Sequence, residues 1–427
     1  GTAEILAADP ATRKLVVPHL DAHAAAELIC SLADRRDDLG GLRREVERVA
    51  KAVFNMPHYV EQLDEFGRAA AERSNPADVR ILVESDRVDP SFVFAPHEPA
   101  HPAEEVARTA MLHWRLWNGI AAGERGVQRA QPFRRGCAGF HPTIYALAHR
   151  AECVDGSRDP MAHWIASGRP AGPWSRQVHI PLAAPEAKSR VALHAHFHYP
   201  ELIGDLLDRL RANKTPVDLF LTTDTEEKAA TLAAAVASYA GLSRIEITPN
   251  RGRDIGPFLT GVLKDIVSGD YDVVGHIHAK RSLAIDAAMG ERWRSFLWEN
   301  LVGGPSAMVD TAASAFAANV SLGLLMAEDP HVVGWDQNRP AADALAARMG
   351  LALPLPDFLD FPLGTMFWAR TAALKPLLDL KLSWGDYPEE PLPDDGTILH
   401  AIERLLPSIV QHAGFETAGL RVPKTTW

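Results

Sequence analysis

From residue 189 onwards, apolar runs typical of buried strands alternate with segments that have helical spacing. The predicted strands are 190–197, 217–223, 244–248, 271–277, 321–326 and 364–369, and the predicted helices are 200–211, 226–240, 257–267, 371–378 and 396–412. Strands and helices in this order are joined by crossovers and build a largely parallel sheet. The sequence therefore predicts an α/β domain with a central sheet flanked by helices.

The first 188 residues have a different character. Residues 18–73 show helical spacing among many charges, whereas residues 75–102 are rich in Pro, Asp and Ser, as connecting segments are. We expect a mainly helical segment over 1–75, a helical and linker region over 76–188, and the α/β domain over 189–427. Because the first residue is Gly and not Met, we expect either a trimmed sequence or a fragment of a longer polypeptide.

The composition excludes several classes of partner. Asp and Glu number 55 against 44 Lys and Arg, a net charge of −11, which disfavours nucleic acid. Cys30, Cys137 and Cys153 lie at no zinc-ligand spacing, which favours a reducing cytoplasm over a disulfide framework. The most apolar long run, 312–327, is shorter than the roughly 20 apolar residues of a membrane span. We therefore expect a cytoplasmic protein.

Ligands of parallel sheets bind beyond the carboxyl ends of the strands. One such loop, 250–256, presents Asn250, the guanidinium groups of Arg251 and Arg253, and the carboxylate of Asp254 before a predicted helix. Backbone N–H groups, the helix dipole and fork-shaped donors suit a diphosphate or a sugar nucleotide. The alternative is a salt-bridged turn, in which Asp254 and an arginine fasten the loop.

Two further strands carry histidines. His276 and His278 share one face of a strand end, followed by Lys280 and Arg281, a cluster that can neutralise phosphate, protonate a leaving group or bind metal. The alternative is one partly buried histidine beside solvated cations. No carboxylate follows at ligand spacing, which argues against metal.

The strand at 191–198 places His194, His196 and His198 on one face. Three imidazoles in a row allow a zinc site, as in a dinuclear hydrolase. The alternatives are that these histidines lie on the solvent-exposed face of an edge or terminal strand, or that a single histidine contacts a substrate.

A pair of carboxylates, Asp394 and Asp395, precedes Gly396 at a predicted helix start, where the helix dipole stabilises negative charge. Helix capping explains one of the two. The other is then free to accept a proton from an attacking hydroxyl group.

Six ordered stretches between 189 and 411 carry a resemblance. They are His196-Phe197-His198-Tyr199, Asp218–Thr223, Pro249–Phe258, His278–Ser282, Gly364–Arg370, and Asp395-Gly396-Thr397 with Ala401–Arg404. Together they resemble the rhamnan synthesis protein F family of bacterial polysaccharide glycosyltransferases. Residues 139–142 and 159–164 are similar to a short segment often attached to these enzymes. More weakly, Val16–Asp21 and the helices after it look like the tail of a B-type glycosyltransferase, so residues 1–75 would be its remnant.

The resemblance implies an A-type glycosyltransferase fold and inverting transfer of a deoxyhexose, typically rhamnose. The donor would be a nucleotide diphosphate sugar. The acceptor would be a growing cell-surface polysaccharide of the O-antigen or rhamnan type, held as a lipid-linked or free oligosaccharide. An acceptor of this kind would bring the protein to the inner face of the cytoplasmic membrane.

The same resemblance implies roles for individual residues. Asp395, or its neighbour Asp394, would take the acceptor proton, and Asp224 would lie near the base or ribose. The donor diphosphate would be held by Asn250, Arg251, Arg253, Asp254, His276, His278, Lys280 and Arg281. The substrate contacts would come from His196, His198, Tyr199 and Trp368. Trp368 and Phe258 would give an apolar floor to a deoxysugar, or else belong to the core.

The sequence departs from the A-type pattern at the fourth strand. Where such enzymes commonly carry Asp-x-Asp to hold a metal ion, this chain has His276-Ile277-His278. Cations from Lys280, Arg281 or Arg253 would neutralise the leaving diphosphate instead. We therefore expect no required cofactor, with a divalent metal ion as the alternative.

Three other functions are compatible with the sequence. A metal-dependent hydrolase would use His194, His196, His276 or His278 as ligands. A non-catalytic glycan-binding module would bind oligosaccharide but no sugar nucleotide. In a B-type transferase, the C-terminal region would only recognise the acceptor.

Overall fold

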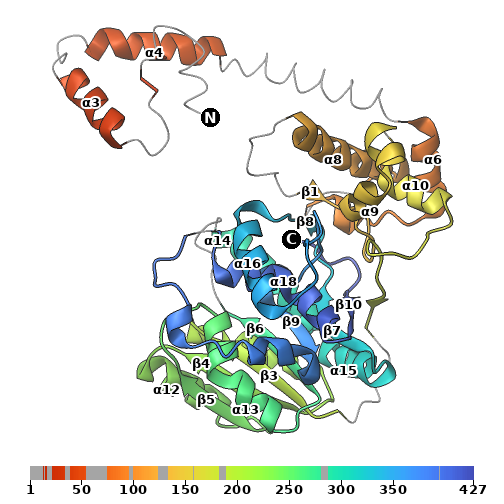
Figure 1. Cartoon of the computed structure of the whole chain (residues 1–427), viewed down its shortest axis with the longest axis vertical. Coiled ribbons are helices and arrows are strands. Elements are labelled where there is room, and N and C mark those ends of the chain that lie inside the picture. Colours follow the sequence, from red (N-terminus) through yellow and green to blue (C-terminus); the bar gives the residue numbers. More distant parts are fainter. Residues whose placement is uncertain are drawn as a thin grey trace. The chain divides into compact units, whose positions relative to one another are not determined.

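The computed structural model describes residues 13, 15–16, 22–33, 39–53, 75–95, 100–123, 133–156, 158–181, 189–279, 287–393 and 395–427 (Figure 1). The chain divides into two compact units, residues 1–74 and residues 75–427. Our predicted domain boundary at residue 188 falls inside the second unit and stays a prediction.

The first unit contains two helices, α3 (Ala22–Ala33) and α4 (Leu39–Val53). Exposed ion pairs lie along α4, such as Arg43 with Glu47 at 3.1 Å. Pairs of this kind contribute little to stability. Most of the stretch that resembles a B-type tail, residues 17–21, lies outside the described residues.

The second unit is built on one mixed sheet. Within the described residues it has eight strands in the order β2-β10-β7-β9-β6-β3-β4-β5. The strands are β2 (Val178–His179), β3 (Val191–His196), β4 (Val217–Thr223), β5 (Ser243–Ile247), β6 (Val273–His278), β7 (Leu322–Ala327), β9 (Phe367–Arg370) and β10 (Glu416–Leu420). Strand β9 runs antiparallel to β6 and β7, and the other pairings are parallel. This confirms the predicted α/β class and its largely parallel sheet.

Helices cover both faces of the sheet, and a separate hydrophobic core fills each side. One core lies against α11 (Ile203–Leu210), α12 (Glu226–Val236), α14 (Ala287–Leu301) and α15 (Met308–Ala318). The other lies against η4 (Pro257–Val262), α13 (Leu263–Ser268), α16 (Arg339–Met349), α17 (Lys375–Asp379) and α18 (Ile398–His412). Alternate residues of β3, β4, β6, β7 and β9 enter opposite cores, as the pleat requires.

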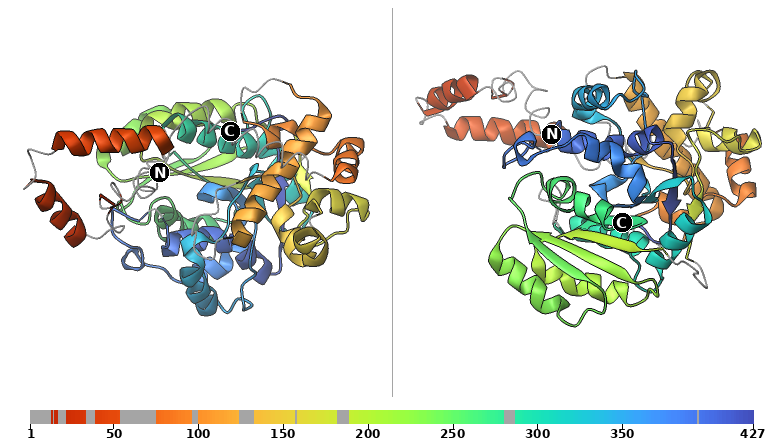
Figure 2. Two further views of the ribbon diagram at one scale, coloured as in Figure 1. Left: turned by 90° about the horizontal axis from the view of Figure 1, so that it is seen from above. Right: turned by 60° about the horizontal axis from the view of Figure 1, so that its bottom comes forward.

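A helical subdomain precedes the sheet and has a core of its own. Its elements are α6 (Pro76–Ser85), α7 (Pro90–Val93), α8 (Ala103–Gly123), β1 (Phe133–Arg134), α9 (Pro142–Ala148), the π-helical η2 (Ala151–Asp155) and α10 (Pro160–Ala166). In Figures 1 and 2 these orange and yellow helices lie at the opposite end of the unit from the green strands β4 and β5. The subdomain is joined to the sheet because β1 pairs with β8 (His331–Val332) and β2 extends the sheet beside β10.

Our interpretation of residues 75–102 as a connecting segment is wrong over α6. Asn75 caps this helix by accepting the Ala77 N–H, and Pro76 occupies its first turn. Turn-forming residues are also the residues that begin helices, which explains the error.

Buried charges fasten the subdomain to the sheet. Glu328, fully buried after β7, pairs with Arg176 and with Arg135, the latter at 3.4 Å. Asp360 forms ion pairs with the same two arginines, at 2.7 Å from Arg176 and 3.0 Å from Arg135. Two cations and two anions therefore balance, which a buried ionic cluster requires. Among the described residues, no helix combines the length and apolar character needed to span a bilayer.

Candidate active site

A cavity of about 380 Å³ opens where β6 ends, the edge that the rule for parallel sheets selects. We call it the sheet-edge cavity. Its wall comes from the loop after β5, α14, the segment before β9, residues 390–392 and α18. Its charged and titratable lining residues are Arg253, Asp254, His278, Arg294, Glu390, His400 and Glu403.

The loop after β5 is shaped to bring Arg253 to this cavity. Gly252 has φ of 78°, and a Cβ atom there would lie 2.9 Å from the Cα of Gly256, so glycine is required. Arg253 itself has φ of 51°. Its Nη1 lies 3.5 Å from Nε2 of His400, while its Nε is buried without a hydrogen-bond partner in the described part of the chain. That N–H is available to a ligand.

Asp254 lies next to Arg253 and is buried. Its Oδ2 accepts from Nε2 of His276 at 3.1 Å. Burial opposes ionisation of Asp254, but the nearby His278 and the hydrogen bond from His276 outweigh it, so the pKa of Asp254 lies well below its ordinary value. Asp254 is therefore an anion that His276 holds by a hydrogen bond.

A chain of hydrogen bonds continues from Asp254 into the sheet. Nδ1 of His276 lies 2.8 Å from Nδ1 of His194, and Nε2 of His194 lies 2.9 Å from Oγ1 of Thr222. Nδ1 of His196 lies 3.0 Å from the same hydroxyl group. Burial holds the pKa of His194 well below its ordinary value and lowers that of His196 to about 4. These two imidazoles are neutral at pH 7 and belong to the series of hydrogen bonds that ends at Asp254.

Two side chains of α18 complete the cavity. His400 is held by Thr397, whose Oγ1 lies 2.9 Å from Nδ1, so Nε2 faces Arg253. Burial lowers the pKa of His400. One turn further, burial raises the pKa of Glu403 against the opposing effect of Arg404 and of backbone N–H groups at Gly364 and Thr365. Glu403 is therefore a carboxylate of increased basicity in the cavity wall.

Asp395 lies just before the start of α18, as the sequence predicts. It does not line the sheet-edge cavity. Its Oδ1 accepts from the amide of Asn338, and its Oδ2 accepts the backbone N–H of Gln337 at 3.1 Å. The helix cap of α18 is Thr397, not Asp395. Asp395 thus ties two loops together, and Asp394 lies outside the described residues.

Several predicted donor ligands also lie outside the cavity lining. Nε of Arg251 donates to the carbonyl of Tyr387 at 2.7 Å, and Asn250 is exposed. Asp224, at the end of β4, accepts from Lys228 at 2.5 Å and lies 3.7 Å from His198. Burial opposes ionisation of Asp224, but Lys228 outweighs it and lowers the pKa.

Other proposed ligand contacts are engaged elsewhere. His276 is fully buried and reaches Asp254, not the cavity. His196 is partly buried and bonded to Thr222, while Tyr199 packs edge-on against His198. Trp368 is 1% exposed, and its Nε1 donates to the carbonyl of Leu301. Trp368 is therefore packed in the core, which is the alternative that the sequence left open.

The structure thus brings Arg253, Asp254 and His278 together from our predicted set. Nε2 of His278 lies 2.8 Å from the carbonyl of Gly364. Lys280 and Arg281 lie outside the described residues. The roles of His400 and Glu403 were not predicted, although their spacing of three residues, which places both on one helix face, is visible in the sequence.

The fold and the cavity define a class: an α/β protein with a charged ligand site at the carboxyl edge of a mostly parallel sheet. The model of the family described as rhamnan synthesis protein F matches residues 176–415, more than half of the chain. The chain therefore belongs to the rhamnan synthesis protein F family. This membership confirms the resemblance and associates the chain with polysaccharide synthesis.

Curated relatives come from Xanthomonas campestris pv. campestris. The uncharacterized protein WxcX of strain B100 is 32% identical over 255 residues, which cover 59% of this chain and 35% of the relative. WxcX of strain ATCC 33913 shows the same identity and coverage. The chain thus matches about a third of the length of these relatives.

Proposed function

We propose that the protein is a glycosyltransferase that transfers a sugar from a nucleotide diphosphate donor to a growing bacterial polysaccharide. The observation that carries this proposal is the sheet-edge cavity, where the guanidinium group of Arg253 shares a wall with the carboxylate of Glu403. A cation suits the leaving diphosphate, and a carboxylate of increased basicity suits the acceptor hydroxyl group.

The donor is proposed to bind with its diphosphate at Arg253 and His278. The unpartnered Nε of Arg253 supports this role, since a buried donor without a partner is costly unless a ligand satisfies it. Asp254 beside it carries a negative charge and would repel phosphate. We assign Asp254 to positioning Arg253 and His278 and not to direct contact with the diphosphate.

The proposed chemical step is a single displacement. Glu403 accepts the proton of the acceptor hydroxyl group as its oxygen bonds to the anomeric carbon. The bond from that carbon to the diphosphate oxygen breaks, and its electron pair leaves with the nucleotide diphosphate. Attack opposite the leaving group inverts the anomeric configuration. We prefer Glu403 to Asp395 because Glu403 lines the same cavity as Arg253, whereas Asp395 does not.

The finer assignments follow from the family. Its description as rhamnan synthesis supports a deoxyhexose, typically rhamnose, as the transferred sugar. We propose in addition an A-type glycosyltransferase fold for residues 189–427. A lipid-linked oligosaccharide acceptor at the inner face of the cytoplasmic membrane is part of the same proposal.

The direct test is binding of nucleotide sugars to the full chain, read as a rise in melting temperature over a panel of donors. Arg253→Ala should weaken binding of the active donor by about 10- to 100-fold, the value of one charged hydrogen bond. Arg251→Ala is the matched control, because its guanidinium group bonds to Tyr387 outside the cavity. Equal losses in both variants, or no donor that binds, would remove the assignment.

The alternatives make different predictions. A hydrolase built on histidine ligands would purify with stoichiometric zinc, but no group of three or more potential ligands with metal-binding geometry occurs among the described residues. A glycan-binding module would bind oligosaccharide in the absence of any donor affinity. Activity that is lost in EDTA and restored by manganese would show that cationic side chains alone do not neutralise the leaving diphosphate.

A further inference from the structure

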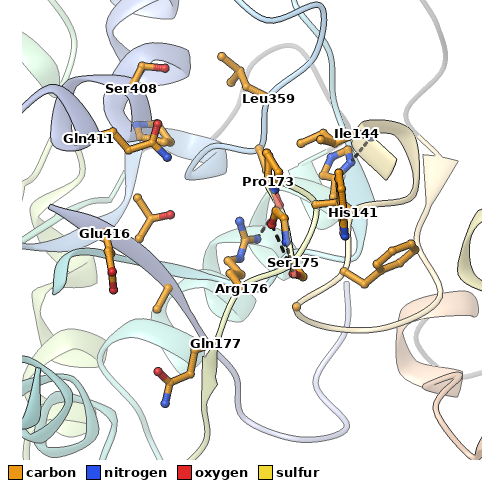
Figure 3. Close-up of a pocket in the computed structure, with 18 of the residues that line it drawn as sticks. His141, Ile144, Pro173, Ser175, Arg176, Gln177, Leu359, Ser408, Gln411 and Glu416 are labelled. Atoms are coloured by element: carbon orange, nitrogen blue, oxygen red, sulfur yellow. Dashed lines mark hydrogen bonds and ion pairs between the residues drawn. The ribbon is translucent and has the colours of Figure 1, made fainter. Parts of the chain in front are cut away.

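A second cavity, of about 610 Å³, lies between the helical subdomain and the end of α18. It is lined by parts of segment 139–177, of the loop 356–360 and of residues 407–418 (Figure 3). Its size falls in the range of about 300–1,000 Å³ that is usual for ligand sites. Among the described residues it shares no lining residue with the sheet-edge cavity.

Polar side chains in this second cavity are free to bind. Within the described part of the chain, the side chains of Gln177, Ser408, Gln411 and Glu416 make no hydrogen bond or ion pair. Figure 3 shows Ser408 and Gln411 on α18, whereas Gln177 and Glu416 come from other segments. Amide and hydroxyl groups that both donate and accept are suited to hydroxyl groups of a ligand.

His141 adds a buried donor. It is 4% exposed, and its Nδ1 accepts the backbone N–H of Ile144 at 3.3 Å, as the dashed line in Figure 3 marks. Burial lowers the pKa of His141 to about 4, so the ring is neutral and carries its proton on Nε2. That N–H has no partner among the described residues.

Aromatic rings supply apolar surface in the same cavity. Trp174 is held in place by the hydrogen bond from its Nε1 to the carbonyl of Pro170 at 2.9 Å. Phe358 also lines the cavity, with its ring centre 5.1 Å from that of His141. Flat apolar faces beside hydroxyl-binding groups match the two kinds of surface that a sugar ring presents, its C–H face and its hydroxyl edge.

The charges in the cavity argue against an anionic ligand. Arg176, the cationic side chain of the described lining, is paired with both Glu328 and Asp360. Glu416 adds a negative charge without a described partner. A phosphate would therefore meet a neutralised arginine and a free carboxylate, whereas a neutral polyhydroxyl chain meets no such penalty.

Helix α18 links the two cavities. His400 and Glu403 line the sheet-edge cavity, while Pro407 and Gln411 line the second one. Spacings of three and four residues place all of them on one face of the helix. At 1.5 Å of rise per residue, Glu403 and Pro407 lie about 6 Å apart along the axis.

We propose that the second cavity binds a neutral oligosaccharide, namely a part of the acceptor chain behind its reacting end. The acceptor role rests on the proposed transferase function. Binding of carbohydrate as such does not.

The test is calorimetric titration of the full chain with a rhamnose tetrasaccharide. Ser408→Trp fills the second cavity and should weaken the affinity at least tenfold. Thr231→Trp, on an exposed face of α12 and in neither cavity, is the matched control and should leave the affinity unchanged. Gln411→Ala removes one amide and disturbs packing less, so it serves as the test if Ser408→Trp does not fold. It should weaken the affinity several-fold.

Donor binding is measured on the same samples. Unchanged donor affinity in Ser408→Trp, together with loss of tetrasaccharide binding, supports the proposal in full. Loss of tetrasaccharide binding with no donor affinity in the wild type overturns the transferase function but leaves a carbohydrate site. Equal tetrasaccharide affinity in the wild type, Ser408→Trp and Gln411→Ala, or no binding at all, overturns the inference.

Discussion

His194 and His276 meet edge to edge against one face of the sheet, with their ring planes within 1° of parallel and their Nδ1 atoms 2.8 Å apart. They are register partners on the parallel strands β3 and β6, so both side chains enter the same layer. One consistent set of donors runs from His196 through Thr222 and His194 to His276, which then donates to Asp254. The chain of polar groups thus ends on the carboxylate that adjoins Arg253.

Removing His276 from this series of hydrogen-bonded side chains should destabilise the fold. His276→Leu leaves Asp254 buried without its hydrogen bond, and we expect the free energy of unfolding to fall by about 3 kcal/mol. Urea unfolding measures it. His412→Leu, at the exposed end of α18, is the control and should change stability by no more than about 0.5 kcal/mol. Equal changes in the free energy of unfolding of the two variants would show that this series of hydrogen bonds does not stabilise the fold.

Buried imidazoles should also make stability depend on pH. Burial lowers the pKa of His141 and of His196 to about 4 in the folded chain, whereas unfolded histidine has a pKa of about 6.5. Between these values the unfolded chain binds more protons, so stability is full at pH 7 and falls on acidification. Each imidazole should cost about 2 kcal/mol by about pH 5. His196→Gln should flatten the curve measured by urea unfolding, and an unchanged slope would contradict the account.

Glu403→Gln should abolish transfer without loss of donor binding. The amide keeps the shape of the side chain but cannot accept the proton, and we expect kcat to fall by about 10²- to 10⁴-fold. Asp395→Asn is the comparison. It should lower stability by about 1–3 kcal/mol, because an amide cannot accept both of its hydrogen bonds, yet retain most of its turnover. Full activity in Glu403→Gln, with none in Asp395→Asn or Asp394→Asn, would return the base to the aspartate pair.

The ionic cluster under the subdomain gives another expected outcome. Glu328→Gln leaves Arg135 and Arg176 with one carboxylate between them, and breaking a buried pair costs about 3–5 kcal/mol. The exposed pair of Lys375 and Asp379 is the control, since Asp379→Asn should cost less than about 1 kcal/mol. Chemical denaturation compares the two. Similar losses in the free energy of unfolding for Glu328→Gln and Asp379→Asn would mean that the subdomain is held by apolar contacts alone.

Much of the sheet could be predicted from sequence because its central strands are continuous apolar runs with clear limits, as in 217–223, which matches β4 residue for residue. Strand β10 was not predicted, since it contains Gly419 and few large apolar residues. The structure explains that glycine: a Cβ atom there would lie 2.1 Å from Oε1 of Glu328. A requirement set by a residue 91 positions away leaves no local signal.

The site was predictable only in part for a similar reason. Strand-end loops are recognisable by their polar composition, which is how Arg253 and His278 were found. The burial of His194 was not predictable, because strand order within a sheet is not written in the strand itself, and β3 proved to be interior rather than an edge. Likewise, only the tertiary packing of α18 decides that Glu403 faces the cavity.

The reversed direction of β9 has a consequence for how such proteins diversify. Because Phe367 begins this strand opposite His276, near the end of β6, the incoming connection supplies Gly364 and Thr365 to the cavity wall. Insertions or deletions in that connection would remodel the wall while every strand pairing is preserved. A change in the length of this one loop would therefore reshape the proposed ligand site without altering the sheet.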